Sequence, residues 1–372
     1  MAAARPHRPS TWSWLGGTLT PTGRPPQVAL VVLLLVGLVV GLVVGLGTGL
    51  LVGRPAGAAA SALLPSLVAG LVSATGTAGA PRIAARVATW AAVVAVSVVG
   101  TAILVSGRPW AAALAMAAVA VLTSAAVGAG PIGGVLGVLS TLAYVLGLVL
   151  ATSADARTQD SPGALLLQLG LAAALGWLVA CGGGWWLHRR QPSSSPSAPG
   201  VVPSPWAAIA GSVRSWDQHS RDGVRRAVPL AGCVLWYQLS ETRDALWVLI
   251  TALAILLPSG KSTVEAAVVR VSATFLGVLL VPLTAQHLPT AVVLVLAVVC
   301  LLVGLAYQPV LPVLAGAASA LGVVLLVGAP TGAAEELALR RLVDTLVGAG
   351  LALVATYLLW PRDRPDDAAA AA

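Results

Sequence analysis

Long runs of residues without charge limit what this chain can fold into. Residues 28–53, 109–154 and 288–334 contain no Asp, Glu, Lys or Arg. A helix needs roughly 20 residues to cross about 30 Å of hydrocarbon. Lipid offers no hydrogen-bond partner to backbone N–H and C=O groups, so such runs must satisfy these groups within helices. The chain is therefore expected to form membrane-spanning helices.

Composition excludes a soluble globular protein. Of the 372 residues, 58% are hydrophobic and 9% are charged, and the mean hydropathy is +0.93. Apolar runs recur along most of the sequence and are interrupted at turn or charge clusters. We predict an all-α, polytopic membrane protein with about 12 transmembrane helices. The predicted spans are residues 28–52, 57–80, 86–106, 109–128, 131–153, 163–187, 226–241, 245–260, 266–286, 290–307, 310–329 and 340–360.

A polar stretch divides these spans into two groups of six. Gly176 and Trp186 in the first group have the same separation as Gly350 and Trp360 in the second. This spacing favours two six-helix pseudo-repeats that point the same way across the membrane. The predicted parts are a disordered tail (1–27), the first membrane half (28–187), a linker with an amphipathic helix (188–225), the second membrane half (226–361) and a second tail (362–372).

The distribution of basic residues predicts the orientation. With the N-terminus inside, most of the 21 Lys and Arg residues fall on the cytoplasmic side. Both termini are then cytoplasmic, and the Ala-, Val-, Gly- and Arg-rich composition points to a bacterial cytoplasmic (inner) membrane. The net charge of +8 reflects this topology and contact with the lipid bilayer, and it does not indicate nucleic-acid binding.

Two of the predicted spans contain the same polar stripe. Residues 270–277 read RVSATFLG and residues 341–348 read RLVDTLVG, so both follow the pattern RxxxTxxG. Positions i, i+4 and i+7 lie on one helical face, and such a face favours protein or a water-filled cavity over lipid. The stripes consist of Arg270, Thr274 and Gly277 in one helix and Arg341, Thr345 and Gly348 in the other. With Gly350, these glycines are predicted to let helices approach closely.

Residues 247–280, WVLITALAILLPSGKSTVEAAVVRVSATFLGVLL, and 340–361, RRLVDTLVGAGLALVATYLLWP, resemble the fusaric acid resistance and aromatic acid exporter superfamily. The plant aluminium-activated malate channels share a similar helix pair. The resemblance implies a membrane module that passes organic anions. The chain departs from the pattern at Ala273, where the family usually has glycine.

The cationic residues are candidates for an anion pathway. Arginine carries a permanent charge and five donors that suit carboxylates. Arg270 and Arg341, with Arg86 and Lys261, are expected to line the pathway, and Thr274, Thr345 and Trp247 belong to the same candidate set. The alternative is that these cations extend to lipid headgroups and anchor helix ends.

Asp344 is the most deeply placed acid in the predicted spans, within one turn of Arg340 and Arg341. It has two interpretations. It could exchange a proton and couple export to the proton gradient, or it could form an ion pair that neutralises the arginines. The residues leave both open, and pairing is the favoured one.

Other signals indicate no further chemistry. The GKS at 260–262 lacks the upstream glycine of a phosphate-binding loop, because Ile255 occupies that position. The three Cys and four His show no metal-ligand spacing, so no metal, cofactor or enzymatic activity is expected. We predict an exporter of amphipathic organic anions, first of all aromatic carboxylates. A passive organic-anion channel and a non-transporting scaffold for envelope assembly remain alternatives, and a homo-oligomer is left open.

Overall fold

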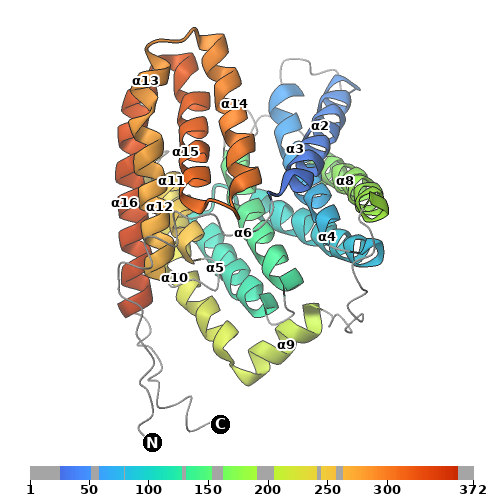
Figure 1. The fold of residues 1–372 in the computed structure, drawn as a ribbon. Coiled ribbons are helices and arrows are strands. Elements are labelled where there is room, and N and C mark those ends of the chain that lie inside the picture. Colours follow the sequence, from blue (N-terminus) through green and yellow to red (C-terminus); the bar gives the residue numbers. More distant parts are fainter. Residues whose placement is uncertain are drawn as a thin grey trace, which may run out of the picture. The chain divides into compact units, whose positions relative to one another are not determined.

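The computed structural model describes residues 26–51, 58–78, 80–127, 131–152, 162–190, 205–240, 244–256 and 263–358. Within these ranges the chain is helical and contains no strand, which confirms the all-α prediction (Figure 1). Nearly all of the predicted tail 1–27, the middle of the predicted linker 188–225 and the predicted tail 362–372 lie outside the described residues.

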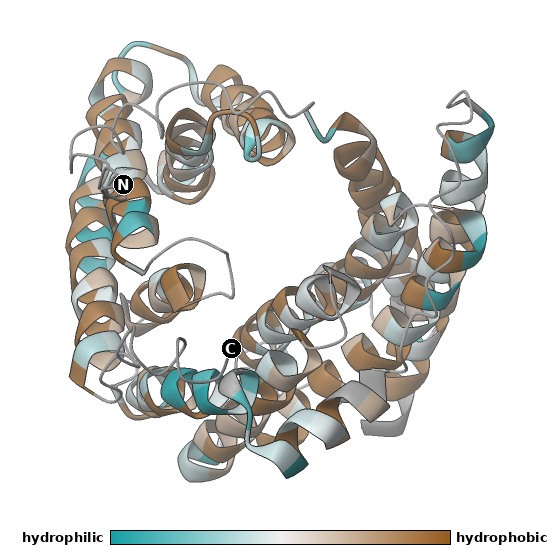
Figure 2. Ribbon diagram, turned by 60° about the horizontal axis from the view of Figure 1, so that its bottom comes forward, coloured by the Kyte–Doolittle hydropathy of each residue, from teal (hydrophilic) through white to brown (hydrophobic). Residues whose placement is uncertain are grey.

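Among the described residues, six helices are long and apolar enough to cross a membrane. They are Val28–Thr48, Pro81–Val105, Pro109–Ala126, Leu165–Arg189, Thr263–Ala285 and Thr290–Tyr307. Four shorter apolar helices are Ala62–Thr77, Leu136–Val149, Ala245–Leu256 and Pro312–Gly328. Figure 2 shows that hydrophobic residues dominate most of the helical ribbon. The protein is therefore a multi-pass membrane protein, whereas the arrangement of 12 spans as two repeats stays a prediction.

The chain forms two compact units, which divide after Val28, after Thr263 and, within the last described helix, after Ala349. The division into two six-helix halves at 188–225 is not tested by these units and stays a prediction. The unit that we call the α12–α16 unit contains residues 264–349. Its elements are α12 (Thr263–Leu279), α13 (Val281–Ala285), α14 (Thr290–Tyr307), α15 (Pro312–Gly328), the 3-10 helix η3 (Ala329–Thr331) and α16 (Ala334–Leu358).

Small residues bring the helices of the α12–α16 unit together. A Cβ added at Gly304 of α14 would lie 2.7 Å from the carbonyl oxygen of Ala315 on α15, and one at Gly322 of α15 would lie 2.7 Å from that of Ala297 on α14. Neither position has room for a side chain. Around this contact, the buried core includes Val281, Val293, Leu321, Val324 and Leu325. Gly332 ends η3 with a φ of 69°, a conformation that favours glycine, and α16 begins directly after it.

The α2–α11 unit contains the remaining helices. These are α2 (Val28–Leu51), α3 (Ala58–Ala74), the 3-10 helix η1 (Thr75–Thr77), α4 (Pro81–Val105), α5 (Pro109–Ala126), α6 (Pro131–Thr152), α8 (Pro162–Arg190), α9 (Pro205–Ser215), α10 (Gln218–Ser240) and α11 (Asp244–Leu256). Several begin with proline, which lacks the N–H that a first helical residue leaves unused. Val68, Val72, Val87, Val99 and Leu169 form its core between α3, α4 and α8.

A sharp turn joins α9 to α10. Trp216 has a φ of 48°, which is uncommon for a residue other than glycine. The carboxylate of Asp217 accepts hydrogen bonds from the Ser212 hydroxyl and, at 3.0 Å, from the Ser220 N–H. The Ser212 bond, with the backbone bond of Ser220, lowers the pKa of Asp217 below its ordinary value. Asp217 therefore caps the start of α10.

Candidate functional site

Polar side chains of the predicted stripes are buried where α12 and α16 lie side by side (Figure 1). Thr345 is 0% exposed, Thr274 2%, Arg341 4% and Asp344 7%. Apolar residues on other faces of the same helices are open, with Phe275 at 52% and Leu346 at 51%. This is the reverse of the pattern in a soluble protein, and it fits helices that face lipid outside and a polar surface inside.

The two threonines touch at the centre of the helix pair. Their Oγ1 atoms lie 3.5 Å apart, and the Thr345 hydroxyl donates to the Arg341 carbonyl at 2.8 Å. A hydroxyl that donates its proton to the carbonyl four residues earlier can still accept a hydrogen bond from another group. The threonines thus place the stripes of α12 and α16 face to face.

Three charged side chains surround this contact. The charges that act on the Arg341 guanidinium are those of Arg270 and Asp344. Arg270 is half-buried, and its Nε makes no hydrogen bond within the part of the chain that the structure describes. Coulomb forces are strong where water is excluded. Two guanidinium groups next to one carboxylate therefore leave an excess of positive charge, which favours a further anion.

Arg340 has a different environment from its neighbour Arg341. Its Nη2 lies 2.6 Å from Oε1 of Glu336, and both side chains are more than half exposed. Exposed ion pairs of this kind contribute little to stability. Arg341, in contrast, is 4% exposed, and the charge of Asp344 acts on it.

The glycines of the stripes have three different environments. A Cβ added at Gly277 would lie 2.7 Å from the Ala317 carbonyl oxygen of α15. Gly348 is buried, whereas Gly350 is exposed and a Cβ there would meet nothing within 4 Å. At Ala273, where the family usually has glycine, the side chain faces Gly316 of α15. At this contact the glycine is therefore on α15 instead of α12.

Residues 231–355 match the family described as fusaric acid resistance protein-like. This part of the chain belongs to that family. The fusaric acid resistance protein-like segment begins in α10 and ends in α16, so it includes Arg270, Thr274, Arg341, Asp344 and Thr345. No curated protein and no solved structure matches the chain.

Two of the other predicted pathway residues lie outside the α12–α16 unit, and a third lies outside the described residues. Arg86 is exposed on α4, and Trp247 is half-buried on α11, both in the α2–α11 unit. Lys261 lies outside the described residues. A shared pathway through these residues and the fusaric acid resistance protein-like cluster stays a prediction.

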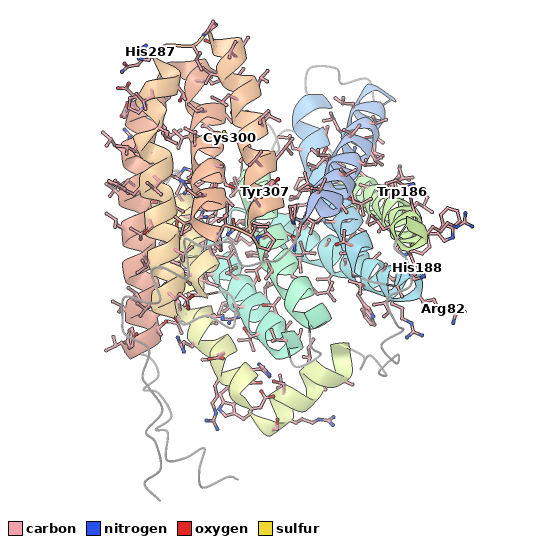
Figure 3. All side chains as sticks on the ribbon, viewed as in Figure 1. Arg82, Trp186, His188, His287, Cys300 and Tyr307 are labelled. Atoms are coloured by element: carbon pink, nitrogen blue, oxygen red, sulfur yellow. The ribbon has the colours of Figure 1, made fainter. Side chains whose placement is uncertain are left out.

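Metal-binding groups do not gather in the described ranges. No set of three or more His, Cys, Asp or Glu side chains that could hold a metal ion occurs there. Figure 3 shows His287 between α13 and α14 and Cys300 farther along α14, well apart. It also shows Arg82 and His188 at the ends of α4 and α8, pointing away from the helices.

Sequence reasoning assigned Arg226 only to the cytoplasmic charge balance. The structure places its Nη1 3.1 Å from the Ser124 hydroxyl of α5, 102 residues away in sequence. Arg226 lies in RDGVRR, a run that resembles an ordinary cytoplasmic flank. No pattern in the sequence indicates that one arginine of this run turns inward.

Proposed function

We propose that the protein is a membrane transporter that moves amphipathic organic anions, with aromatic carboxylates as the first substrate class. One observation carries the proposal: two guanidinium groups and one carboxylate gather on the inner faces of α12 and α16. The fusaric acid resistance protein-like family is generally one of transporters rather than of enzymes, which supports this proposal.

The chemistry of the cluster fits a carboxylate that binds and leaves. A guanidinium donates two parallel hydrogen bonds to a carboxylate, and Arg270 and Arg341 lie close enough for their charges to interact. Asp344 reduces the positive charge, so an anion is attracted but not held as tightly as by two free arginines. Transport requires this balance, because a site that binds too strongly releases slowly.

Asp344 is also proposed as the group that couples transport to protons. Protonation of its carboxylate would leave both arginines without a nearby negative charge and strengthen anion binding. Binding would then depend on the proton gradient. In this proposal the chain has 12 spans in two repeats, lies in a bacterial cytoplasmic membrane with both termini inside, and exports its substrate.

The test is flux of radiolabelled benzoate through proteoliposomes that contain the full chain. Arg341→Ala and Arg270→Ala should each lower the flux by about tenfold or more, since each removes a charged hydrogen-bond donor. Arg341→Lys should retain part of it. The matched control is Arg340→Ala, which removes the adjacent but exposed arginine and should leave flux within about twofold.

The same assay separates the mechanisms. For a proton-driven exporter, Asp344→Asn should abolish the dependence on a pH gradient. Flux that follows the membrane potential and ignores the pH gradient indicates a passive channel. If the intact protein passes no benzoate or other organic anion, the transport proposal is wrong and a scaffold role is favoured.

A further inference from the structure

A long apolar groove runs between α4, α5 and α6 in the α2–α11 unit. We call it the α4–α6 groove. It has a volume of about 330 Å³ and is lined by Trp90–Thr101 of α4, Ala115–Ala126 of α5, Leu136–Ser140 of α6 and Ile209 of α9. The lining residues of α4 extend over eleven helical steps, or about 16 Å at 1.5 Å per step. The groove is therefore long.

The groove wall is apolar in practice although it contains hydroxyl groups. Thr101 donates to the Ser97 carbonyl at 2.8 Å, Thr123 to the Ala120 carbonyl at 3.2 Å, and Ser140 to the Leu136 carbonyl. These protons are therefore used within their own helices. Val93 and Leu122 are 52% and 44% exposed, so the groove is open along its length. Such a surface, apolar and about 16 Å long, suits a hydrocarbon chain.

One end of the groove adjoins a partly buried positive charge. Thr123 and Gly137 line both the groove and a small cavity of about 10 Å³ that also contacts Arg226, Thr141 and Leu253. The two spaces are neighbours across the close contact of α5 with α6, where a Cβ at Gly137 would lie 3.0 Å from the Thr123 carbonyl oxygen. The small cavity has room for about one water molecule, which is also the room needed by one carboxylate oxygen.

Arg226 is suited to receive that oxygen. One of its five donors bonds to Ser124, which is 2% exposed. Its neighbour Arg225 is used differently, lying 3.7 Å from the Asp222 carboxylate and 3.3 Å from the Thr263 hydroxyl. The charge of Asp222 acts on Arg226 as well. Two arginines thus share one carboxylate, and Arg226 is the one that lines the small cavity.

We propose that the α4–α6 groove binds a medium-chain fatty acid, with its hydrocarbon chain in the groove and its carboxylate on Arg226. Complementary charge favours an acid over a neutral chain of the same length. The water-sized cavity favours a carboxylate oxygen over the bulkier phosphodiester of a phospholipid. This site lies in a different unit from the α12–α16 cluster and does not depend on the proposed transport of organic anions.

The test uses dodecanoate with a photoreactive diazirine at its far end, added to the full chain in nanodiscs of phosphatidylcholine. After irradiation, mass spectrometry of peptides locates the label. The label should be concentrated on α4 and α5, within residues 90–126, and unlabelled dodecanoate should compete for it. Dodecanol, which has the same chain without the charge, should compete at least about tenfold more weakly.

Matched variants distinguish a site from general contact with lipid. Arg226→Gln should weaken competition by dodecanoate about tenfold or more, whereas Arg225→Gln, one residue away, should leave it within about twofold. Ala118→Trp places a bulky side chain in the groove from an exposed position. It should block labelling while leaving Arg226 and the fold in place.

Three results would overturn this proposal. The label could spread over all lipid-facing helices, the two arginine variants could behave alike, or phosphatidylglycerol could compete better than dodecanoate. Benzoate flux is measured separately. Loss of labelling with intact flux rejects only the fatty-acid site, and loss of flux with intact labelling rejects only the transport function.

Discussion

Arg86 of α4 and Arg270 of α12 are each followed by a threonine about one helical turn later, at i+3 in α4 and at i+4 in α12, but their surroundings differ. Arg86 and Thr89 are exposed, and the Thr89 hydroxyl accepts a 3.0 Å hydrogen bond from Trp177 on α8. Val93 follows at the seventh position and is 52% exposed. On α12 the seventh position is Gly277, which packs against α15, and Thr274 is buried.

The difference shows what converts a polar stripe into a buried site. An arginine and a threonine on one face do not bury themselves, because removing them from solvent is costly. On α12 a glycine admits a neighbouring helix, and the polar face of α16 covers the rest. On α4 the threonine is one position earlier and the seventh position is valine, and Arg86 and Thr89 remain on the surface.

The largest expected effect comes from removing the carboxylate of the buried cluster. Asp344→Asn leaves Arg270 and Arg341 together without a negative charge, and it should lower the free energy of unfolding by about 3–5 kcal/mol. Glu336→Gln, which breaks the exposed pair with Arg340, should change it by less than about 1 kcal/mol. Both are measured by chemical unfolding in detergent.

A second substitution checks the origin of the Asp344 effect. Replacing Arg270 as well, in Asp344→Asn with Arg270→Gln, should recover at least half of the lost stability, because the repulsion between guanidinium groups is gone. If the double variant is as unstable as the sum of the single variants, the charges are not coupled.

The next largest effect on stability is expected at Gly277 and tests whether its lack of a side chain admits the neighbouring helix. Gly277→Val introduces atoms where a Cβ alone would lie 2.7 Å from the Ala317 carbonyl oxygen, and overpacking of this kind should destabilise the protein by about 1–3 kcal/mol. Gly350→Ala is the control. It should leave stability unchanged or raise it by up to about 1 kcal/mol, because the site is open and alanine favours helix. Thermal unfolding in detergent measures both.

Sequence patterns predicted much of this architecture. Each of the 12 predicted spans overlaps a described helix, although the span 266–286 covers both α12 and α13 and the 12-span arrangement stays a prediction. The helices form because uncharged runs in a membrane must satisfy their backbone groups internally. The i, i+4, i+7 rule also selected the face on which Thr274 and Thr345 are buried. Both results follow from local rules that need no tertiary information.

Which arginines are buried depends on how the helices pack against one another, and local sequence rules do not describe this packing. Arg340 and Arg341 are adjacent and look equivalent in sequence, yet one is exposed and the other buried, because α12 covers only one side of α16. Arg226 was similarly hidden in a run of charges, and its partner Ser124 lies 102 residues earlier. A single sequence does not indicate such a distant contact.

A smaller effect is expected at the threonine contact. Thr345→Val keeps the shape but removes the hydroxyl between the two stripes, and it should cost about 1 kcal/mol. Thr89→Val on α4 should cost less, about 0.5 kcal/mol, since the hydrogen bond that the Thr89 hydroxyl accepts from Trp177 is exposed. Equal losses at the two positions would contradict the contrast between buried and exposed stripes. Chemical unfolding of the two variants side by side provides the measurement.

The smallest effect is expected for the exposed arginines themselves. Arg340→Ala and Arg86→Ala should each change the free energy of unfolding by less than about 0.5 kcal/mol, and the Arg340 effect should shrink further in high salt. Unfolding in low-salt and high-salt buffer checks this. A large, salt-independent loss for Arg340→Ala would place it among the buried charges.

The buried Arg341 and Asp344 of α16 also bear on how the chain is assembled. Insertion by the translocon is disfavoured by about 2.5–3.5 kcal/mol for each charged residue at the centre of a helix. Alone in lipid, α16 would meet this penalty with only an internal pair to reduce it. We therefore expect α16 to integrate stably only once α12 is present to receive its polar side, so that its insertion reports whether the earlier helices are correctly folded.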